Sequence, residues 1–179
     1  MSFFTRKGDD GTTGWLGKGR IPKDDPRIET VGALDEASAA LGVARASARD
    51  PRTAAIVLEA QRDLYRLMAA VAASPDRAGE FHFDAGRVAW LEQQIEALGR
   101  DLAMPAEFII PGDSPAEAAF AMARTTVRRA ERRLVTFCDQ AHVQNPAWKE
   151  YLNRLSSLLF VLELLENRAA GKPTTPARA

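Results

Sequence analysis

Apolar residues recur along most of this chain at intervals of three and four, the spacing that places them on one face of an α-helix. Prolines interrupt the pattern, and no stretch shows the period of two that is typical of strands. The pattern predicts helices over about 27–48, 53–73, 84–102, 115–138 and 146–169. We therefore expect an all-α fold, an up-and-down bundle of five helices in a single domain covering 1–179.

Two segments lie outside this bundle, which is expected to occupy 27–170. Residues 1–26 are predicted to form an irregular leader rich in glycine, threonine, lysine and aspartate. Residues 171–179 contain two prolines and no apolar period, so this tail is expected to be disordered.

The fourth predicted helix has the clearest start. The turn Pro111–Asp113 is followed by Ser114 in the N-cap position and by Pro115 in the first helical position. Glu117 comes three residues after the cap, where a capping box places its acid. These signals predict that the helix begins at Pro115.

Three charged residues lie beside the apolar stripe of this helix. Arg124, Arg128 and Glu131 are three and four residues apart, so they project in one direction. Arginines at the edge of a buried face need a carboxylate, a phosphate or a partner subunit. Position alone favours a structural ion pair over an anion site, because buried charges are more often paired than functional. Asp35, beside the apolar face of the first helix, is one candidate partner.

Composition narrows the possible functions. The 24 basic and 24 acidic side chains cancel, which disfavours non-specific nucleic-acid binding. The single cysteine, Cys138, cannot form an internal disulfide and is expected to be a small buried thiol. No apolar run approaches ~18 residues and no signal-peptide pattern occurs, so we expect a cytoplasmic protein without a membrane span. His82 and His142 lack a second ligand at metal-binding spacing, so no protein-held metal is expected.

The leader has an inventory that suits phosphate. Its glycines allow the backbone to approach a ligand closely. Hydroxyls and cations come from Thr5, Arg6, Lys7, Thr12, Thr13, Lys18 and Lys23. No GxxxxGK[ST] loop is present. Composition alone favours a surface segment that caps the fold over a phosphate site.

Two further features require a partner. Phe108, Ile109 and Ile110 are adjacent apolar residues in a predicted loop, so they need cover from the core, another protein or a ligand. The fifth helix is apolar over most of its circumference and is predicted to be the most buried. Asn153 within it therefore needs a specific hydrogen-bond partner, either another helix or a ligand, and Ser157 would share its direction.

Three motifs carry the chemistry: TRKGDDGTTG at 5–14, ARTTVRRAER at 123–132 and YLNRLS at 151–156. A fourth block, KDDPRIE followed by LDE, covers 23–36. In this order and spacing they resemble the PduO-type ATP:cob(I)alamin adenosyltransferases, over nearly the whole chain from Thr5 to about Asn167. The chain departs from the family pattern at Asp113, Met122 and Ser157.

The resemblance implies a homotrimer of helical bundles with active sites between subunits, where ATP and a corrinoid bind. Mg²⁺ would be held mainly by ATP. Arg124 would pair with Asp35 across the subunit interface. The residues implied for ATP binding are Thr5, Arg6, Lys7, Gly8, Thr13, Gly14, Lys23, Arg128, Arg129, Glu131, Arg132 and Asn153.

The implied reaction is attack of cob(I)alamin on the 5′ carbon of ATP, which expels triphosphate and gives adenosylcobalamin. It needs no protein nucleophile, so positioning and charge neutralisation by groups such as Arg128 would suffice. Phe108 matches the family position that removes the lower axial ligand of cobalt. A reductase and a B12-dependent mutase are the implied partners. Two alternatives are an escort that binds adenosylcobalamin with little turnover, and a purely structural bundle.

Overall fold

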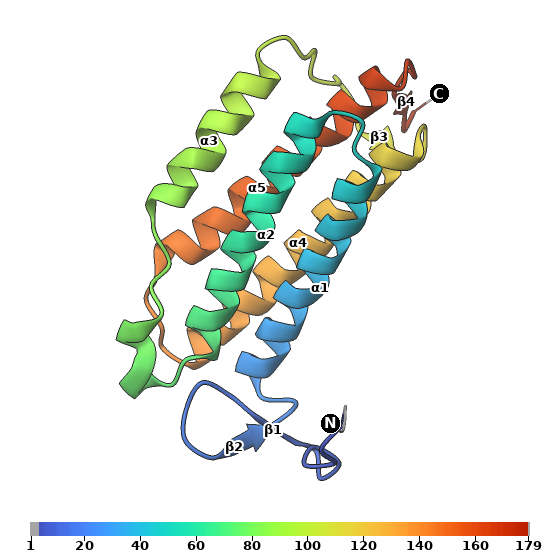
Figure 1. Cartoon of the computed structure of the whole chain (residues 1–179). Coiled ribbons are helices and arrows are strands. Elements are labelled where there is room, and N and C mark those ends of the chain that lie inside the picture. Colours follow the sequence, from blue (N-terminus) through green and yellow to red (C-terminus); the bar gives the residue numbers. More distant parts are fainter. Residues whose placement is uncertain (1–3, 179) are drawn as a thin grey trace.

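The structure is a computed structural model that describes residues 4–178. Within these residues the chain forms five α-helices that run alternately up and down (Figure 1). Their bounds are α1 Pro26–Ser47, α2 Pro51–Ala72, α3 Gly86–Gly99, α4 Pro115–Gln140 and α5 Pro146–Ala169. Helix α1 packs between α2 and α4, α4 also packs on α5, and α3 lies along α5. The predicted five-helix bundle is confirmed.

Proline and a preceding polar residue set the start of four helices. Prolines occupy the first position of α1, α2, α4 and α5, where the missing N–H has no intrahelical partner to lose. The carboxylates of Asp25 and Asp50 and the hydroxyl of Ser114 accept backbone N–H groups there. Helix α2 therefore begins two residues before its predicted start.

The third helix is shorter than its predicted range of 84–102. Asp84 accepts the N–H of Gly86, but it stands before the helix, and the side chain of the N-cap residue, Ala85, accepts no hydrogen bond. Before α3, the stretch predicted as loop over 74–83 contains a short 3₁₀ helix, η1, Pro75–Glu80.

The core lies between the apolar faces of α1, α2, α4 and α5. Cys138 is buried there as predicted, and burial raises the pKa of its thiol. None of the helices among residues 4–178 is long and apolar enough to cross a bilayer. The largest fully buried side chains include Leu34, Leu41, Leu64, Leu67, Phe120, Leu134, Tyr151, Leu155 and Leu159.

Two short antiparallel sheets of two strands each lie at opposite ends of the bundle (Figure 1). In the leader, β1 Thr12–Gly14 pairs with β2 Arg20–Pro22. At the other end, β3 Ile109–Ile110 pairs with β4 Thr175–Pro176. The expectation of a disordered tail is therefore wrong over the part that forms β4. The prediction rested on the composition of the tail, which carries no information about the hydrogen-bond acceptors in residues 108–113.

Candidate functional site

The leader is fixed to the end of the bundle where α1 begins. The N–H of Leu16 donates to the carbonyl of Ala72 at 3.1 Å, and the N–H of Ser74 donates to Leu16 at 2.9 Å. The Arg27 guanidinium lies over the rings of Trp15 and Phe137, 5.2 and 4.8 Å from their centroids. The leader is therefore attached to α1, α2 and α4 together.

Within the leader, Arg20 holds the turn that precedes β1. Its guanidinium donates to the carbonyl of Lys7 at 2.6 Å and to the carbonyl and hydroxyl of Thr12 at 2.8 Å each. The turn between them contains Gly8, where an added Cβ would lie 3.2 Å from Nζ of Lys23. The Lys23 ammonium thus lies against the Gly8 backbone, so two of the residues predicted for ATP binding are neighbours in space.

Lys23 also connects the leader to α4. It lines a cavity of about 320 Å³ together with Glu29 and Glu36 of α1 and Arg129 and Arg133 of α4. Arg129 pairs with Glu36 at 2.5 Å, and Arg133 pairs with Glu29 at 3.1 Å. These arginines and Lys23 put three cations around one cavity, so an anion can be bound there by exchange of partners.

A second group of predicted residues lies on the other side of α4, toward α5. The side-chain amide of Asn153 donates to Glu131 Oε1 at 3.2 Å, and the Arg154 guanidinium donates to Asn153 Oδ1 at 3.1 Å. Asn153 is exposed, so its predicted burial is wrong. The motif YLNRLS at 151–156 is divided between two faces of α5, because Tyr151 and Leu152 point into the core while Asn153 points outward.

Arg128 and Arg132 lie on the outward face of α4 between these two groups. Both are exposed, and neither side chain makes an ion pair or hydrogen bond to any other residue between 4 and 178. Four arginines at 128, 129, 132 and 133 therefore form a cationic surface with two members free for a ligand or a second subunit.

Arg124 has a partner within its own chain other than the predicted Asp35. Its Nε donates to Glu163 Oε2 of α5 at 2.9 Å, and its guanidinium lies 5.6 Å from the Phe160 ring centroid. Glu163 is fully buried, and burial raises the pKa of its carboxyl, while Arg124 acts in the opposite direction. The expected contact of Arg124 with Asp35 of another subunit stays a prediction. Asp35 is exposed on α1.

Glu163 is the residue that sequence analysis missed. It stands within the apolar run LLFVLELLE, and an acid at a core position of such a run needs a cation. Its position on α5 could have been compared with the arginines of α4, because consecutive helices of an up-and-down bundle usually pack together.

At the far end of the bundle the apolar loop is open to solvent. Phe108 is 89% exposed and Ile110 is 51% exposed, and Met104 and Met122 nearby in the chain are also exposed. Glu117 fixes the following turn, because its Oε2 accepts the N–H groups of Gly112 and Asp113 at 2.7 and 3.0 Å. The capping box is confirmed on one side, where Ser114 Oγ accepts the Glu117 N–H. Its reciprocal bonds go to the two residues before Ser114.

Of the remaining predicted leader residues, Thr5 and Arg6 lie at the start of the turn that precedes β1, and Thr13 and Gly14 follow it within β1. The Thr5 hydroxyl accepts the N–H of Lys7, Arg6 has a positive φ of 58°, and the Thr13 hydroxyl donates to the Gly14 carbonyl. Within residues 4–178 no cluster of three or more His, Cys, Asp or Glu side chains is arranged to hold a metal ion.

The chain is similar to known proteins over most of its length. Residues 3–166 match the model of the family described as cobalamin adenosyltransferase. The chain is 40% identical to a cobalamin adenosyltransferase of Cupriavidus metallidurans, over 93% of this chain and 89% of that protein. It is 35% identical to the corrinoid adenosyltransferase PduO of Citrobacter freundii, over 95% of this chain and 51% of that protein. The chain therefore spans about half the length of that PduO protein.

A solved structure shares the same fold. It is a variant of a PduO-type ATP:corrinoid adenosyltransferase from Lactobacillus reuteri, complexed with cobalamin and ATP. The TM-score is 0.89 at 26% sequence identity, covering 99% of this chain and all of the other. The chain described here belongs to the cobalamin adenosyltransferase family.

Proposed function

We propose that this protein is an ATP:cob(I)alamin adenosyltransferase. The cobalt–carbon bond forms as the bond between the 5′ carbon and the triphosphate oxygen breaks, and the bonding electron pair leaves with triphosphate. The observation that carries the proposal is the cavity shared by Lys23 of the leader and the arginines of α4. Family membership supports the same assignment.

The proposed role of the leader and α4 is to bind the triphosphate and neutralise the charge that grows on it. The cations are provided by Lys23, Arg128, Arg129 and Arg132, and the Gly8 backbone lies against Lys23. Glu29 and Glu36 would be released from their arginines as the triphosphate binds, and their carboxylate oxygens fit Mg²⁺ carried on ATP. Bound in this way, Mg²⁺ would add further charge neutralisation at the phosphates.

The corrinoid would bind against the apolar loop. Phe108 is almost fully exposed, and exposure of a phenyl ring on this scale suits contact with a flat apolar ligand. In the proposed reaction Phe108 excludes the lower ligand and water from the cobalt. The axial ligation of the metal is the property that this side chain would change.

Distances along α4 support a site between subunits. Arg129 lies 14 residues beyond the start of α4 at Pro115, which is about 20 Å along the helix axis. Phe108 precedes that start, so one chain holds its proposed corrinoid and nucleotide surfaces near opposite ends. We propose a homotrimer in which the two surfaces come from neighbouring chains, and exposed Asp35 is available for such a contact.

Turnover distinguishes this proposal from an adenosylcobalamin-binding escort. The protein is mixed with ATP, Mg²⁺ and excess chemically reduced cobalamin, and the adenosylcobalamin spectrum is followed over many equivalents of product. We expect repeated turnover, whereas an escort gives at most one tightly bound equivalent. A folded protein that forms no product contradicts the proposal. A reductase that supplies cob(I)alamin, a mutase that consumes the product and a cytoplasmic location are parts of the proposal.

A further inference from the structure

The C-terminal tail is tied to the loop that contains Phe108. After α5 the chain turns at Gly171, which has a φ of 66°, and the carbonyl of Pro173 accepts the amide of Asn167 at 3.0 Å. The tail then pairs with β3, and the N–H of Ala177 donates to the carbonyl of Phe108 at 2.7 Å. The last described residues of the protein therefore contact the backbone of the proposed cobalt-facing residue.

Asp113 provides the side-chain attachment for this tail. Its Oδ2 accepts the N–H of Thr175 at 2.8 Å, and its Oδ1 accepts the Thr175 hydroxyl at 2.6 Å. These two hydrogen bonds hold the pKa of the Asp113 carboxyl below its usual value. A residue with no side chain at position 113 could not make this attachment.

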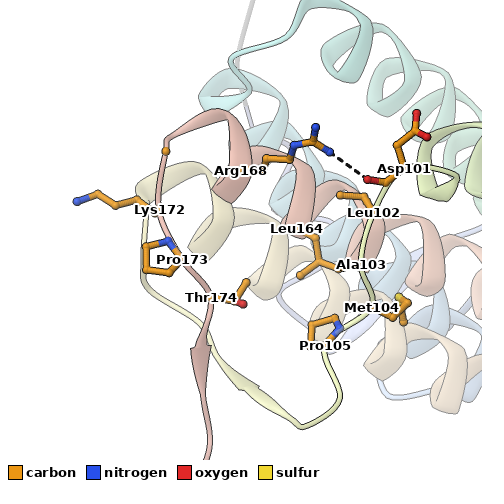
Figure 2. Close-up of a pocket in the computed structure, with 11 residues that line it drawn as sticks. Asp101, Leu102, Ala103, Met104, Pro105, Leu164, Arg168, Lys172, Pro173 and Thr174 are labelled. Atoms are coloured by element: carbon orange, nitrogen blue, oxygen red, sulfur yellow. Dashed lines mark hydrogen bonds between the residues drawn. The ribbon is translucent and has the colours of Figure 1, made fainter.

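Apolar packing does little to hold the tail in place. A cavity of about 660 Å³ lies between it and the segment after α3, with Pro173 and Thr174 on one side and Met104 and Pro105 on the other (Figure 2). Thr175 and Pro176 are exposed. The position of the tail therefore depends on hydrogen bonds, of which the Asp113 pair is the one made by a charged side chain.

We propose that Asp113 and Thr175 are a positioning pair that fixes Phe108 against the corrinoid through β4. The Asp113–Thr175 hydrogen bonds attach the tail to the loop. Strand β4 of the tail then forms the sheet with β3, which holds the loop backbone in one conformation. This inference rests on the proposed function for its kinetic consequence. The attachment itself is a property of the free protein.

The first test needs no substrate. Thr175→Val removes the hydroxyl donor and keeps the shape of the side chain. Hydrogen–deuterium exchange of peptides covering 106–112 and 172–178 should speed up, because the Ala177 N–H opens more often. Thr174→Val is the matched control, since the Thr174 hydroxyl has no hydrogen bond within the described chain. Exchange of the same two peptides in this variant should match that of the unmodified protein. Asp113→Ala removes both acceptors, and equal exchange in Thr175→Val, Asp113→Ala and the unmodified protein overturns the attachment.

The second test measures its effect on the reaction. Thr175→Val should raise KM for cob(II)alamin, with a reductant present, by about fivefold, as loss of one modest hydrogen bond does, and leave KM for ATP unchanged. The spectroscopic signal of four-coordinate cob(II)alamin should weaken, and Thr175→Ser, which keeps the hydroxyl, should restore it. Unchanged constants overturn the positioning role, and so does faster turnover, which would make the tail an obstruction. Absence of transfer by the unmodified protein instead refutes the proposed function, and the exchange result still decides whether the attachment exists.

Discussion

Replacing Arg124 by alanine separates a structural role for this arginine from a catalytic one. The substitution leaves Glu163 fully buried without its cation. Breaking a buried ion pair by removing one partner destabilises proteins by about 3–5 kcal/mol. Because 27% of the Arg124 side chain remains exposed, water already screens part of the pair, and we expect about 3 kcal/mol. For a chain of this length that lowers Tm by about 8 °C.

The loss should depend on pH in a defined direction. Burial raises the pKa of Glu163 above its unfolded value, and Arg124 offsets part of that rise. Without Arg124 the Glu163 carboxyl stays protonated to higher pH in the folded protein than in the unfolded chain. Stability therefore falls as pH rises from the unfolded pKa of Glu163 to its folded pKa. The loss in Tm should therefore be small near the pKa of an ordinary glutamate, about 4.3, and largest at neutral pH.

Thermal unfolding followed by circular dichroism between pH 4.5 and 8 measures this effect. Arg128→Ala is the matched control, because Arg128 is exposed on the same helix and its side chain has no partner within the described chain. Its Tm should change little. The double substitution Arg124→Met with Glu163→Gln should recover most of the stability lost by Arg124→Ala. An unchanged Tm together with lost activity would refute the structural assignment and place Arg124 among the ligand-binding residues.

Three further substitutions test the proposed site. Arg128→Ala should abolish transfer with the fold intact, since it removes a charge-assisted contact to triphosphate, and unchanged turnover removes Arg128 from the site. Phe108→Ala should slow reaction from cob(II)alamin more than from prereduced cob(I)alamin, and equal losses would contradict the axial role. Gly8→Ala should raise KM for ATP several-fold because its Cβ displaces Lys23 Nζ, whereas Gly79→Ala, which meets open space, should not. Equal KM values in both glycine variants would separate Lys23 from ATP binding.

The helices could be predicted from sequence because their signals are local. Proline at the first position and a capping side chain mark where α1 and α4 begin, and the three-to-four period marks the buried faces. Residue type marked the cationic leader and the α4 arginines as candidates for anion binding, but taken alone it favoured a surface segment and a structural ion pair. Their meeting at Lys23 was predicted only through the family resemblance, because it depends on how the leader folds over α1.

The contacts that could not be predicted from the sequence join distant parts of the chain. Arg124 meets Glu163 across 39 residues, and Asp113 meets Thr175 across 62. A tail with two prolines has no period of its own, so its strand becomes visible only beside β3. Asn153 was misplaced because an apolar average over α5 hides one polar edge that faces Glu131.

In the proposed reaction the leader and α4 bind triphosphate as a single leaving group while the 5′ carbon of ATP moves to cobalt. ATP labelled with ¹³C at the 5′ carbon tests it directly, with reduced cobalamin and the unmodified protein. Carbon NMR should show the label bonded to cobalt, and phosphorus NMR should show one intact triphosphate for each labelled product. Release of ADP or pyrophosphate in place of triphosphate, or a label that never reaches cobalt, would contradict the account.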